Sequence, residues 1–443
     1  HKTQRRVLII LAGVILLGLG LRGIFFFQFS RTPFYRYPTL DALDYKKTAL
    51  NVANGRLIQD RAFFLGPAYP YLLGAAYTLT GGRIWTSRAL VLLLWPAIAI
   101  LIYMVGTKTF GPARGLLGAL LYAAHTPALF YEQTLLMEGT LSFFVLLFVT
   151  LWLLADKKER PAWYAAAGVA LGICAVFRGN FLLFVPAAMA MLFIPRPEGK
   201  NNNPLKMSAL KNTLIFAGAT ALAILPATIH NYLAEKDFVL LTSNGGINLF
   251  IGNSENATGA FETPPGVDMA VEMTGRRQAE QALGRSPLKS SEISRWWRNR
   301  AIASMSRNPL RVVKLAFAKM RYFWGRPDLG QVYSLDHMGQ VMPAMKWPLF
   351  SGALLGPLAL AGLVLAFMQK NVKGRTASGF VLLYMISLLP FFMTARYRLP
   401  VAGLLCLLSA HAAISFVESL RSREWFRAAA LGVGIALAAF LLN

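Results

Sequence analysis

Long apolar segments recur along nearly the whole chain, separated by polar loops. An apolar helix of about 18 residues or more can cross the roughly 30 Å hydrocarbon core of a bilayer. The pattern therefore predicts an all-α polytopic membrane protein with about eleven transmembrane helices. The predicted spans cover residues 7–28, 89–107, 115–131, 136–155, 162–177, 180–195, 212–229, 347–368, 376–394, 399–417 and 426–442. The first is expected to be a signal anchor, because it is longer than the apolar core of a removable signal peptide.

Two long polar stretches interrupt these spans, and both lie outside the cell membrane if the N-terminus is cytoplasmic. They divide the chain into three predicted domains. Residues 1–229 would form an N-terminal transmembrane catalytic module that includes a first outer loop at 29–88. Residues 230–346 would form a small mixed extracytoplasmic loop subdomain, and residues 347–443 the C-terminal transmembrane helices.

The first outer loop carries the signals of two helices. Thr39 is expected to be the N-cap of a helix that runs to Gly55 as its stop. Helical spacing would place Asp44 and Tyr45 on the same face as Asp41. The apolar stretch 72–79 is too short to span a bilayer, so it is expected to be a re-entrant or interfacial helix.

The second outer loop should contain both extended and helical segments. Residues 238–242 are predicted to be a short β-like run, and 243–246 a glycine-rich turn. The polar segment that continues from the turn has backbone N–H groups suited to an anion. Its candidate side chains are Asn244, Asn248 and Asn253. Residues 309–324 are predicted to form a basic amphipathic helix on the membrane surface.

Composition supports the membrane class and gives the chain an orientation. The sequence is 56% hydrophobic and only 15% charged, with a mean hydropathy of +0.48, which is too apolar for a water-soluble domain of 443 residues. The net charge of +25 comes largely from cations in alternate short loops, a positive-inside pattern that argues against nucleic-acid binding. Those cations are Lys108, Arg114, Lys157, Lys158, Arg160, Arg196, Lys200, Lys206, Lys211, Lys370, Lys373, Arg375, Arg421, Arg423 and Arg427.

The two cysteines, Cys174 and Cys406, fall inside predicted spans. Small apolar packing is the usual role of a cysteine in such a place. The sequence therefore predicts neither a disulfide framework nor a cysteine-rich metal cluster.

Charged and polar side chains gather at the outer ends of the predicted spans. Such groups near the membrane are costly and are functional candidates by default. They are Asp41, Asp44, Glu132, Glu138, Arg178, His230, Arg396 and Arg398. A carboxylate among arginines suits the transfer of a group from a phosphate, because the carboxylate orients or deprotonates an acceptor hydroxyl while guanidinium groups neutralise the phosphate.

Structural roles are equally compatible with each of these residues taken alone. Asp41 at a helix N-terminus would favour the helix dipole. Glu132 and Glu138 would serve as partners of buried arginines such as Arg178. Arg396 and Arg398 would anchor the chain at the membrane interface.

The order of these segments resembles the GT-C superfamily of membrane glycosyltransferases, and within it the bacterial relatives of glycosyltransferase family 39, the protein O-mannosyltransferase and aminoarabinose-lipid A transferase group. The resemblance covers about residues 35 to 400. The segments that carry it are Asp41-Ala42-Leu43-Asp44-Tyr45 with Ala49 and Gly55, Pro67-Ala68-Tyr69-Pro70-Tyr71, Glu132 with Glu138, Phe177-Arg178-Gly179-Asn180, His230-Asn231-Tyr232, Thr242-Ser243-Asn244-Gly245-Gly246-Ile247-Asn248 with Ile251-Gly252-Asn253, and Ala395-Arg396-Tyr397-Arg398-Leu399-Pro400.

The resemblance implies an inverting transfer of a sugar from a polyprenyl-phosphate donor, on the periplasmic face of a bacterial inner membrane, to a protein, lipid or glycan hydroxyl. It assigns catalysis to Asp41. Acceptor or donor orientation would fall to Asp44, Tyr45, Tyr69, Glu132 and Glu138, and phosphate binding to Arg178, His230, Arg396 and Arg398.

Two departures from the pattern of that group bear on these assignments. Ala42 follows Asp41 where the mannosyltransferases often have an acidic pair, which leaves the use of a divalent cation such as Mg²⁺ or Mn²⁺ open. His230 stands where an arginine is expected, so a phosphate contact there would depend on pH. The alternatives to a glycosyltransferase are a lipid or sugar transporter or flippase, and an assembly subunit that kept this fold without activity.

Overall fold

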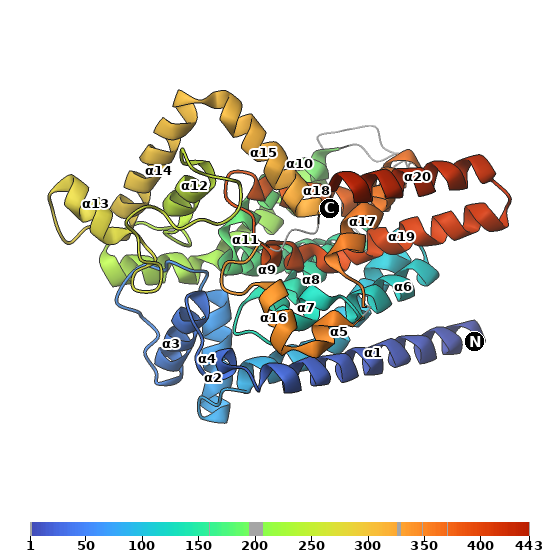
Figure 1. Cartoon of the computed structure of the whole chain (residues 1–443), viewed down its shortest axis with the longest axis horizontal. Coiled ribbons are helices and arrows are strands. Elements are labelled where there is room, and N and C mark those ends of the chain that lie inside the picture. The colour runs from blue at the N-terminus through green and yellow to red at the C-terminus, as the bar shows by residue number, and fades with distance from the viewer. Residues whose placement is uncertain are drawn as a thin grey trace.

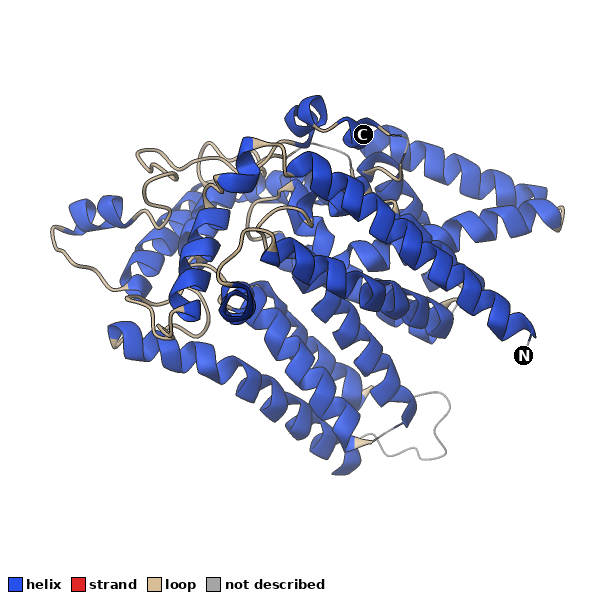
Figure 2. Cartoon of the chain, turned by 90° about the horizontal axis from the view of Figure 1, so that it is seen from below, coloured by secondary structure: helices blue, strands red, loops and turns tan. Residues whose placement is uncertain are grey.

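The computed structural model is built almost wholly of helices, as Figure 2 shows. It describes residues 2–158, 160–194, 207–325, 329–347, 349–369 and 371–442. Over these residues the extended pairing amounts to two isolated bridges, His125 with Phe350 and Ala260 with Met393. The predicted all-α fold is therefore confirmed. Four cations of the positive-inside pattern, Arg196, Lys200, Lys206 and Lys370, lie outside the described residues.

Every predicted span contains a helix. These helices are α1 (Lys2–Phe29), α5 (Thr86–Thr109), α6 (Pro112–Ala123) with α7 (Thr126–Tyr131), α8 (Glu138–Lys158), α9 (Pro161–Phe177), η1 (Gly179–Leu183) with α10 (Phe184–Phe193), α11 (Met207–Glu235), α17 (Gly352–Met368), α18 (Val372–Leu388), α19 (Ala402–Arg421) and α20 (Trp425–Leu442). Six helical segments in the described chain are long and apolar enough to cross a membrane. The count of eleven spans stays a prediction.

Glycines let neighbouring helices of the bundle approach closely. A Cβ on Gly168 of α9 would lie 2.4 Å from the Phe216 carbonyl oxygen of α11, and the Thr220 hydroxyl donates to the Gly168 carbonyl oxygen at 3.1 Å. A Cβ on Gly362 of α17 would lie 1.9 Å from the Leu408 carbonyl oxygen of α19. Small residues at such contacts are the usual means by which membrane helices pack.

The first outer loop folds into α2 (Pro33–Arg36), α3 (Asp41–Ala53) and α4 (Ala68–Thr80). Both longer helices were predicted, and Gly55, with φ of +82°, ends α3 as expected. Thr39 is not the N-cap, however. Leu40 occupies that position at φ 50° without a side-chain capping bond. A branched residue in this region is uncommon and costs on the order of 1–3 kcal/mol.

The second outer loop is helical throughout its regular part, which corrects the expected mixed subdomain. It contains α12 (Gly245–Asn253), α13 (Arg276–Leu283), α14 (Ser290–Arg307), α15 (Pro309–Trp324), α16 (Leu335–Val341) and η2 (Pro343–Lys346). Residues 238–242 are irregular because the Asn231 amide nitrogen donates to the carbonyl oxygens of Val239 and Leu241, at 2.8 and 3.0 Å, which a strand partner would otherwise use. The predicted turn at 243–246 is present at Ser243 and Asn244, whereas Gly245 and Gly246 are the first residues of α12.

The outer loops gather at one end of the bundle (Figure 1). Helices α3, α12, α13 and α14 lie at the left of that view, whereas the N-terminus of α1 and the connection between α19 and α20 lie at the right. A second, smaller hydrophobic cluster supports the loop helices, with Phe250 of α12 against Trp297 of α14 at 4.8 Å between ring centres.

Candidate functional site

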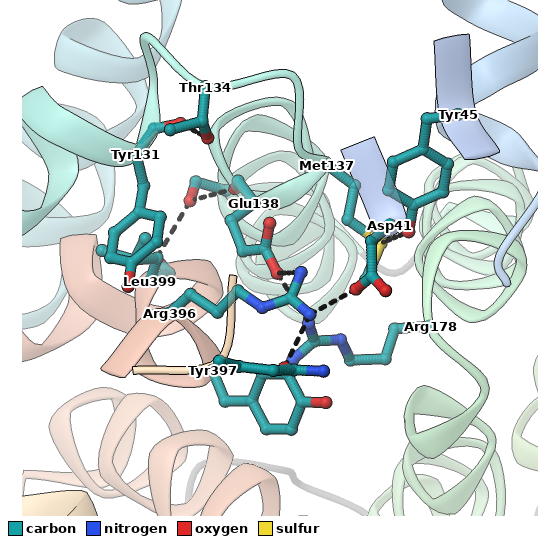
Figure 3. A network of polar contacts seen from close by, with 12 residues as sticks. Asp41, Tyr45, Tyr131, Thr134, Met137, Glu138, Arg178, Arg396, Tyr397 and Leu399 are labelled. Atoms are coloured by element: carbon teal, nitrogen blue, oxygen red, sulfur yellow. Dashed lines mark hydrogen bonds and ion pairs between the residues drawn. The ribbon is translucent and has the colours of Figure 1, made fainter. Parts of the chain in front are cut away.

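Asp41 and Arg396 form a buried ion pair where the first outer loop meets the bundle. Asp41 is the first residue of α3, and Arg396 lies in η3 (Ala395–Val401), which precedes α19. The Arg396 Nη2 donates to the Asp41 carboxylate and, at 2.8 Å, to Oε1 of Gln331. Side chains of the pair are only 4% and 10% exposed. Asp41 therefore faces the interior of the protein and not bulk solvent (Figure 3).

Glu138 extends this pair into a row of four alternating charges. It is the first residue of α8, and its Oε1 accepts from Arg178 Nη2 at 2.9 Å and from Arg396 Nη1 at 3.3 Å. Its Oε2 is buried and has no hydrogen-bond partner in the described chain. The row Arg178–Glu138–Arg396–Asp41 is electrically balanced, which is what buried charges require.

Two tyrosines hold Arg178 at the end of this row. The Arg178 guanidinium lies 4.1 Å from the centre of the Tyr397 ring, a cation–π contact. The Tyr384 hydroxyl accepts from Arg178 Nη1 at 3.4 Å and donates to the Tyr397 carbonyl oxygen at 2.8 Å. Tyr384, Tyr397 and Gln331 were not predicted as site residues. Of the three, Tyr397 alone is marked in the sequence, by its position between two arginines.

A pocket of about 60 Å³ opens beside the carboxylate of Asp41. Its polar wall contains Asp41, Gln331 and Tyr397, together with Asn244, the N-cap of α12, and Asn248 within α12. The remaining lining is mostly apolar, from Leu40, Phe64, Leu65, Ile247, Ile251, Phe261, Met269, Met273 and Phe392. The pocket therefore joins the loop helices to the charged row, and it brings together the predicted Asn244, Asn248 and Asp41.

Tyr45, one turn from Asp41 on α3, packs against Tyr69. The Tyr45 hydroxyl is 3.5 Å from the sulfur of Met137, and its ring meets Tyr69 edge-on at 5.3 Å between centres. Burial, followed by the charges of Asp41 and Glu138, raises the pKa of Tyr45 well above its usual value. Tyr45 therefore stays uncharged and packs as a buried neutral side chain beside Asp41 and Glu138.

Asp44 lies one turn along α3 from Asp41 and is paired with no cation in the described chain. Burial raises the pKa of Asp44 to about 6, with the negative charge of Asp41 adding to the effect. The two acids of α3 therefore differ, because Asp41 has a guanidinium partner and Asp44 has none.

Glu132 does not reach Tyr45, Arg178 or Arg396. Its Oε1 accepts from Arg22 Nη2 at 3.0 Å and from the Tyr122 hydroxyl at 3.2 Å, and its Oε2 lies 2.7 Å from Arg22 Nε as an ion pair. The Arg22 guanidinium also lies 3.7 Å from the centre of the Trp95 ring. A cation in the middle of α1 needs a counter-charge, and Glu132 supplies it. The only signal for Arg22 was a charge inside an apolar run.

Three other candidates also lie apart from the row. Arg398 donates to the Gly325 carbonyl oxygen, because two residues of a 3₁₀ helix turn the side chain by roughly 240° from that of Arg396. The His230 ring stacks on Phe63 at 3.7 Å and its Nε2 accepts from the Gln59 backbone N–H at 2.9 Å. Asn253 donates to the carbonyl oxygens of Leu249 and Pro390.

The site lacks a ligand set for a resident metal ion. No group of three His, Cys, Asp or Glu that could hold a cation occurs within the described part of the chain. Asp41 is engaged by Arg396 and Glu138 by Arg178 and Arg396, so Asp44 is the one acid beside Asp41 that has no arginine partner among the described residues. The residues present therefore do not fit a bound divalent cation, and no catalytic step is assigned to one.

Comparison with known proteins gives one match by sequence and several by fold. Residues 65–228 match the family model described as dolichyl-phosphate-mannose-protein mannosyltransferase. The fold resembles that of the Archaeoglobus fulgidus oligosaccharyltransferase in its apo form, with a TM-score of 0.56 and 14% identity over 98% of this chain and 55% of that chain. The predicted resemblance to the GT-C membrane glycosyltransferases is confirmed. The chain spans about half the length of that archaeal protein.

Other structures of similar proteins contain ligands. The same archaeal oligosaccharyltransferase, AglB, in complex with an inhibitory peptide and a dolichol-phosphate gives a TM-score of 0.54 at 14% identity, over 99% of this chain and 55% of that chain. ArnT from Cupriavidus metallidurans, bound to undecaprenyl phosphate, gives only 0.37 at 12% identity, over 93% of this chain and 78% of that chain, which is too low to support an inference. A search of curated proteins finds none that matches this sequence.

Proposed function

We propose that this protein is a glycosyltransferase that moves a sugar from a polyprenyl-phosphate donor to an acceptor hydroxyl on the extracytoplasmic face of a membrane, with inversion at the anomeric carbon. The observation that carries the proposal is the buried row of Asp41, Arg396, Glu138 and Arg178 beside a pocket. The family match and the dolichol-phosphate in the structurally similar AglB support the choice of donor.

Asp41 is proposed to bind the acceptor hydroxyl and take its proton. The hydroxyl oxygen attacks the anomeric carbon and forms the new glycosidic bond, while the bond from that carbon to the phosphate oxygen breaks. The electron pair of the broken bond leaves on polyprenyl phosphate, which gains one negative charge. The proton of the hydroxyl passes to Asp41, so atoms and charge balance.

Arg396 is proposed to couple these two events. In the free protein it is shared between Asp41 and Glu138. Once Asp41 is protonated, it attracts the guanidinium less strongly, and Arg396 can turn its charge to the phosphate at the moment when the phosphate becomes more negative. Arg178, fixed by Tyr384 and Tyr397, supplies the second cation. Glu138 holds the two guanidinium groups side by side against their mutual repulsion.

The basic loops predicted on one side of the bundle support an orientation in which the site faces away from the cytoplasm. A bacterial inner membrane fits the relatives named from the sequence pattern. The acceptor class, whether protein, lipid or glycan, depends on what enters the largely apolar pocket beside Asp41.

The test is an assay of the purified protein with a panel of polyprenyl-phosphate sugars and hydroxyl acceptors. We expect release of polyprenyl phosphate together with a glycosylated product for at least one donor. Movement of an intact donor across vesicle membranes without release would instead favour a flippase. Neither release nor transport across the panel would favour an inactive assembly subunit and would overturn the proposal.

A further inference from the structure

Helix α15 presents a mixed apolar and cationic face that the described chain leaves uncovered. Leu310, Val313 and Phe317 recur on one side of the helix and are 74%, 53% and 65% exposed. Lys314 and Arg321 lie on the same side, since they follow Leu310 by four and eleven residues. Neither cation has a hydrogen bond or ion pair within the described residues.

The opposite side of α15 is firmly attached to the protein. Leu315, Phe323 and Trp324 are buried, and the Lys319 ammonium, only 1% exposed as a residue, donates to the Leu389 carbonyl oxygen at 2.9 Å. The position and the rotation of the helix are therefore fixed. The exposure of Leu310, Val313 and Phe317 is therefore not the result of a loosely held helix that could rotate and bury them.

The C-terminal end of α15 adjoins the end of a candidate membrane span. A Cβ on Gly325, directly after α15, would lie 2.2 Å from the Leu442 carbonyl oxygen of α20. Phe440 and Leu441 of α20 are 83% and 58% exposed. Figure 1 shows α15 running from its junction with α14 down to this end of α20. The C-terminal end of α15 therefore lies beside the exposed apolar end of the span.

The surrounding charge selects an anionic partner. Residues 290–324, which form α14 and α15, contain eight lysines and arginines, and Glu292 is their one acidic residue. We propose that the exposed face of α15 lies in the interface of the leaflet that adjoins the outer end of α20. Leu310, Val313 and Phe317 would insert among the acyl chains, and Lys314 and Arg321 would bind anionic phospholipid headgroups. This inference does not depend on the proposed glycosyltransferase activity.

The experiment uses the full chain in nanodiscs of phosphatidylcholine with and without phosphatidylglycerol. A fluorescent label on the F317C variant reports local lipid through quenching by brominated phosphatidylcholine or brominated phosphatidylglycerol at equal mole fraction. Both native cysteines are buried, so they do not compete for the label. A label on the L283C variant of α13, which lies at the far end of the loop helices in Figure 1, is the matched exposed control.

We expect the F317C label to be quenched by lipid and the L283C label to be quenched by iodide in water. We also expect brominated phosphatidylglycerol to quench the F317C label more than brominated phosphatidylcholine does. Each of the two cations should raise the local ratio of phosphatidylglycerol to phosphatidylcholine by about fivefold. The K314Q/R321Q variant should reduce that preference to about one, whereas R277Q on α13 should leave it unchanged.

Two results would overturn the inference. A label on F317C that is reached by iodide and not by brominated lipid would place α15 in water, and a label reached by neither quencher would place α15 under a protein partner. Equal quenching by the two lipids, in the protein that keeps Lys314 and Arg321, would show that α15 does not prefer anionic phospholipid. The V313C variant, labelled in the same way, guards against an effect peculiar to the F317C substitution.

Discussion

The two arginines that flank Tyr397 should respond differently to the same conservative change. Arg396→Lys alters a group with three acceptors, on Asp41, Glu138 and Gln331. Arg398→Lys alters a group whose described hydrogen bond is to the Gly325 carbonyl oxygen. Both side chains are buried, so the two variants differ in what they contact and not in exposure.

The size of the effect follows from the number of contacts that a lysine can keep. A single ammonium on a flexible stem replaces a planar fork and retains about one of the three partners of Arg396. Losing two hydrogen bonds from a charged donor, at about 1.5 kcal/mol each, amounts to about 3 kcal/mol, or a roughly 100- to 1,000-fold loss in kcat/KM if these contacts act in the transition state. For Arg398→Lys we expect a change in kcat/KM of less than about threefold.

The assay is polyprenyl phosphate release at several donor concentrations, with the melting temperature of each variant measured in the same detergent. Both variants must remain folded at the assay temperature for the comparison to hold. An R396K enzyme within tenfold of the unaltered protein would refute the reasoning. So would an R398K enzyme that loses as much activity as R396K while melting normally.

Three further substitutions test the buried polar groups around the site. Asp44→Asn should remove a pH dependence of stability. Because the pKa of Asp44 is raised to about 6 in the folded protein, the unaltered protein should become more stable as the pH falls from 7 towards 4. Melting temperatures measured across this pH range should rise in the unaltered protein, and the Asp44→Asn variant should lack this contribution. Arg22→Met or Glu132→Gln alone should each destabilise the protein by about 3–5 kcal/mol, and the double variant by clearly less than their sum; additive losses in denaturant unfolding would reject the pairing. Asn231→Ala should cost about 2–4 kcal/mol by the same measurement, because the amide satisfies two backbone carbonyls and its oxygen accepts a backbone N–H; a loss under 0.5 kcal/mol would contradict this.

The helices could be predicted because each depends on a local pattern. Apolar runs of about 20 residues fix where the long helices lie, and Gly55 ends α3 through its own conformation. The irregular conformation of residues 238–242, which were predicted to be a β-like run, could not be foreseen from the sequence. Its strand-like residues follow local propensity, but their carbonyl oxygens are taken by the Asn231 side chain of α11. Tertiary contacts of this kind override local preference.

The clustering of four of the site residues was predictable from sequence, and the pairing of the charged residues only in part. Asp41, Glu138, Arg178 and Arg396 were all expected near one another, and they are. Glu132 is only six residues from Glu138, yet its partner is Arg22, 110 residues away in the chain. Pairing of buried charges depends on which helices lie beside each other, and a single sequence does not contain that information. The same holds for Gln331, which comes from an irregular segment.

The most direct test of the central proposal is the single-turnover rate of polyprenyl phosphate release by Asp41→Asn, measured beside donor affinity. Asp60→Asn is the matched control, because Asp60 lies in the same outer loop but its side chain is 80% exposed and, among the described residues, paired only with Arg56. We predict a roughly 100- to 10,000-fold slower release for D41N, donor affinity weakened by no more than about threefold, and an unchanged D60N. Release by folded D41N within about tenfold of the unaltered protein would contradict the assignment of Asp41 as the group that accepts the hydroxyl proton.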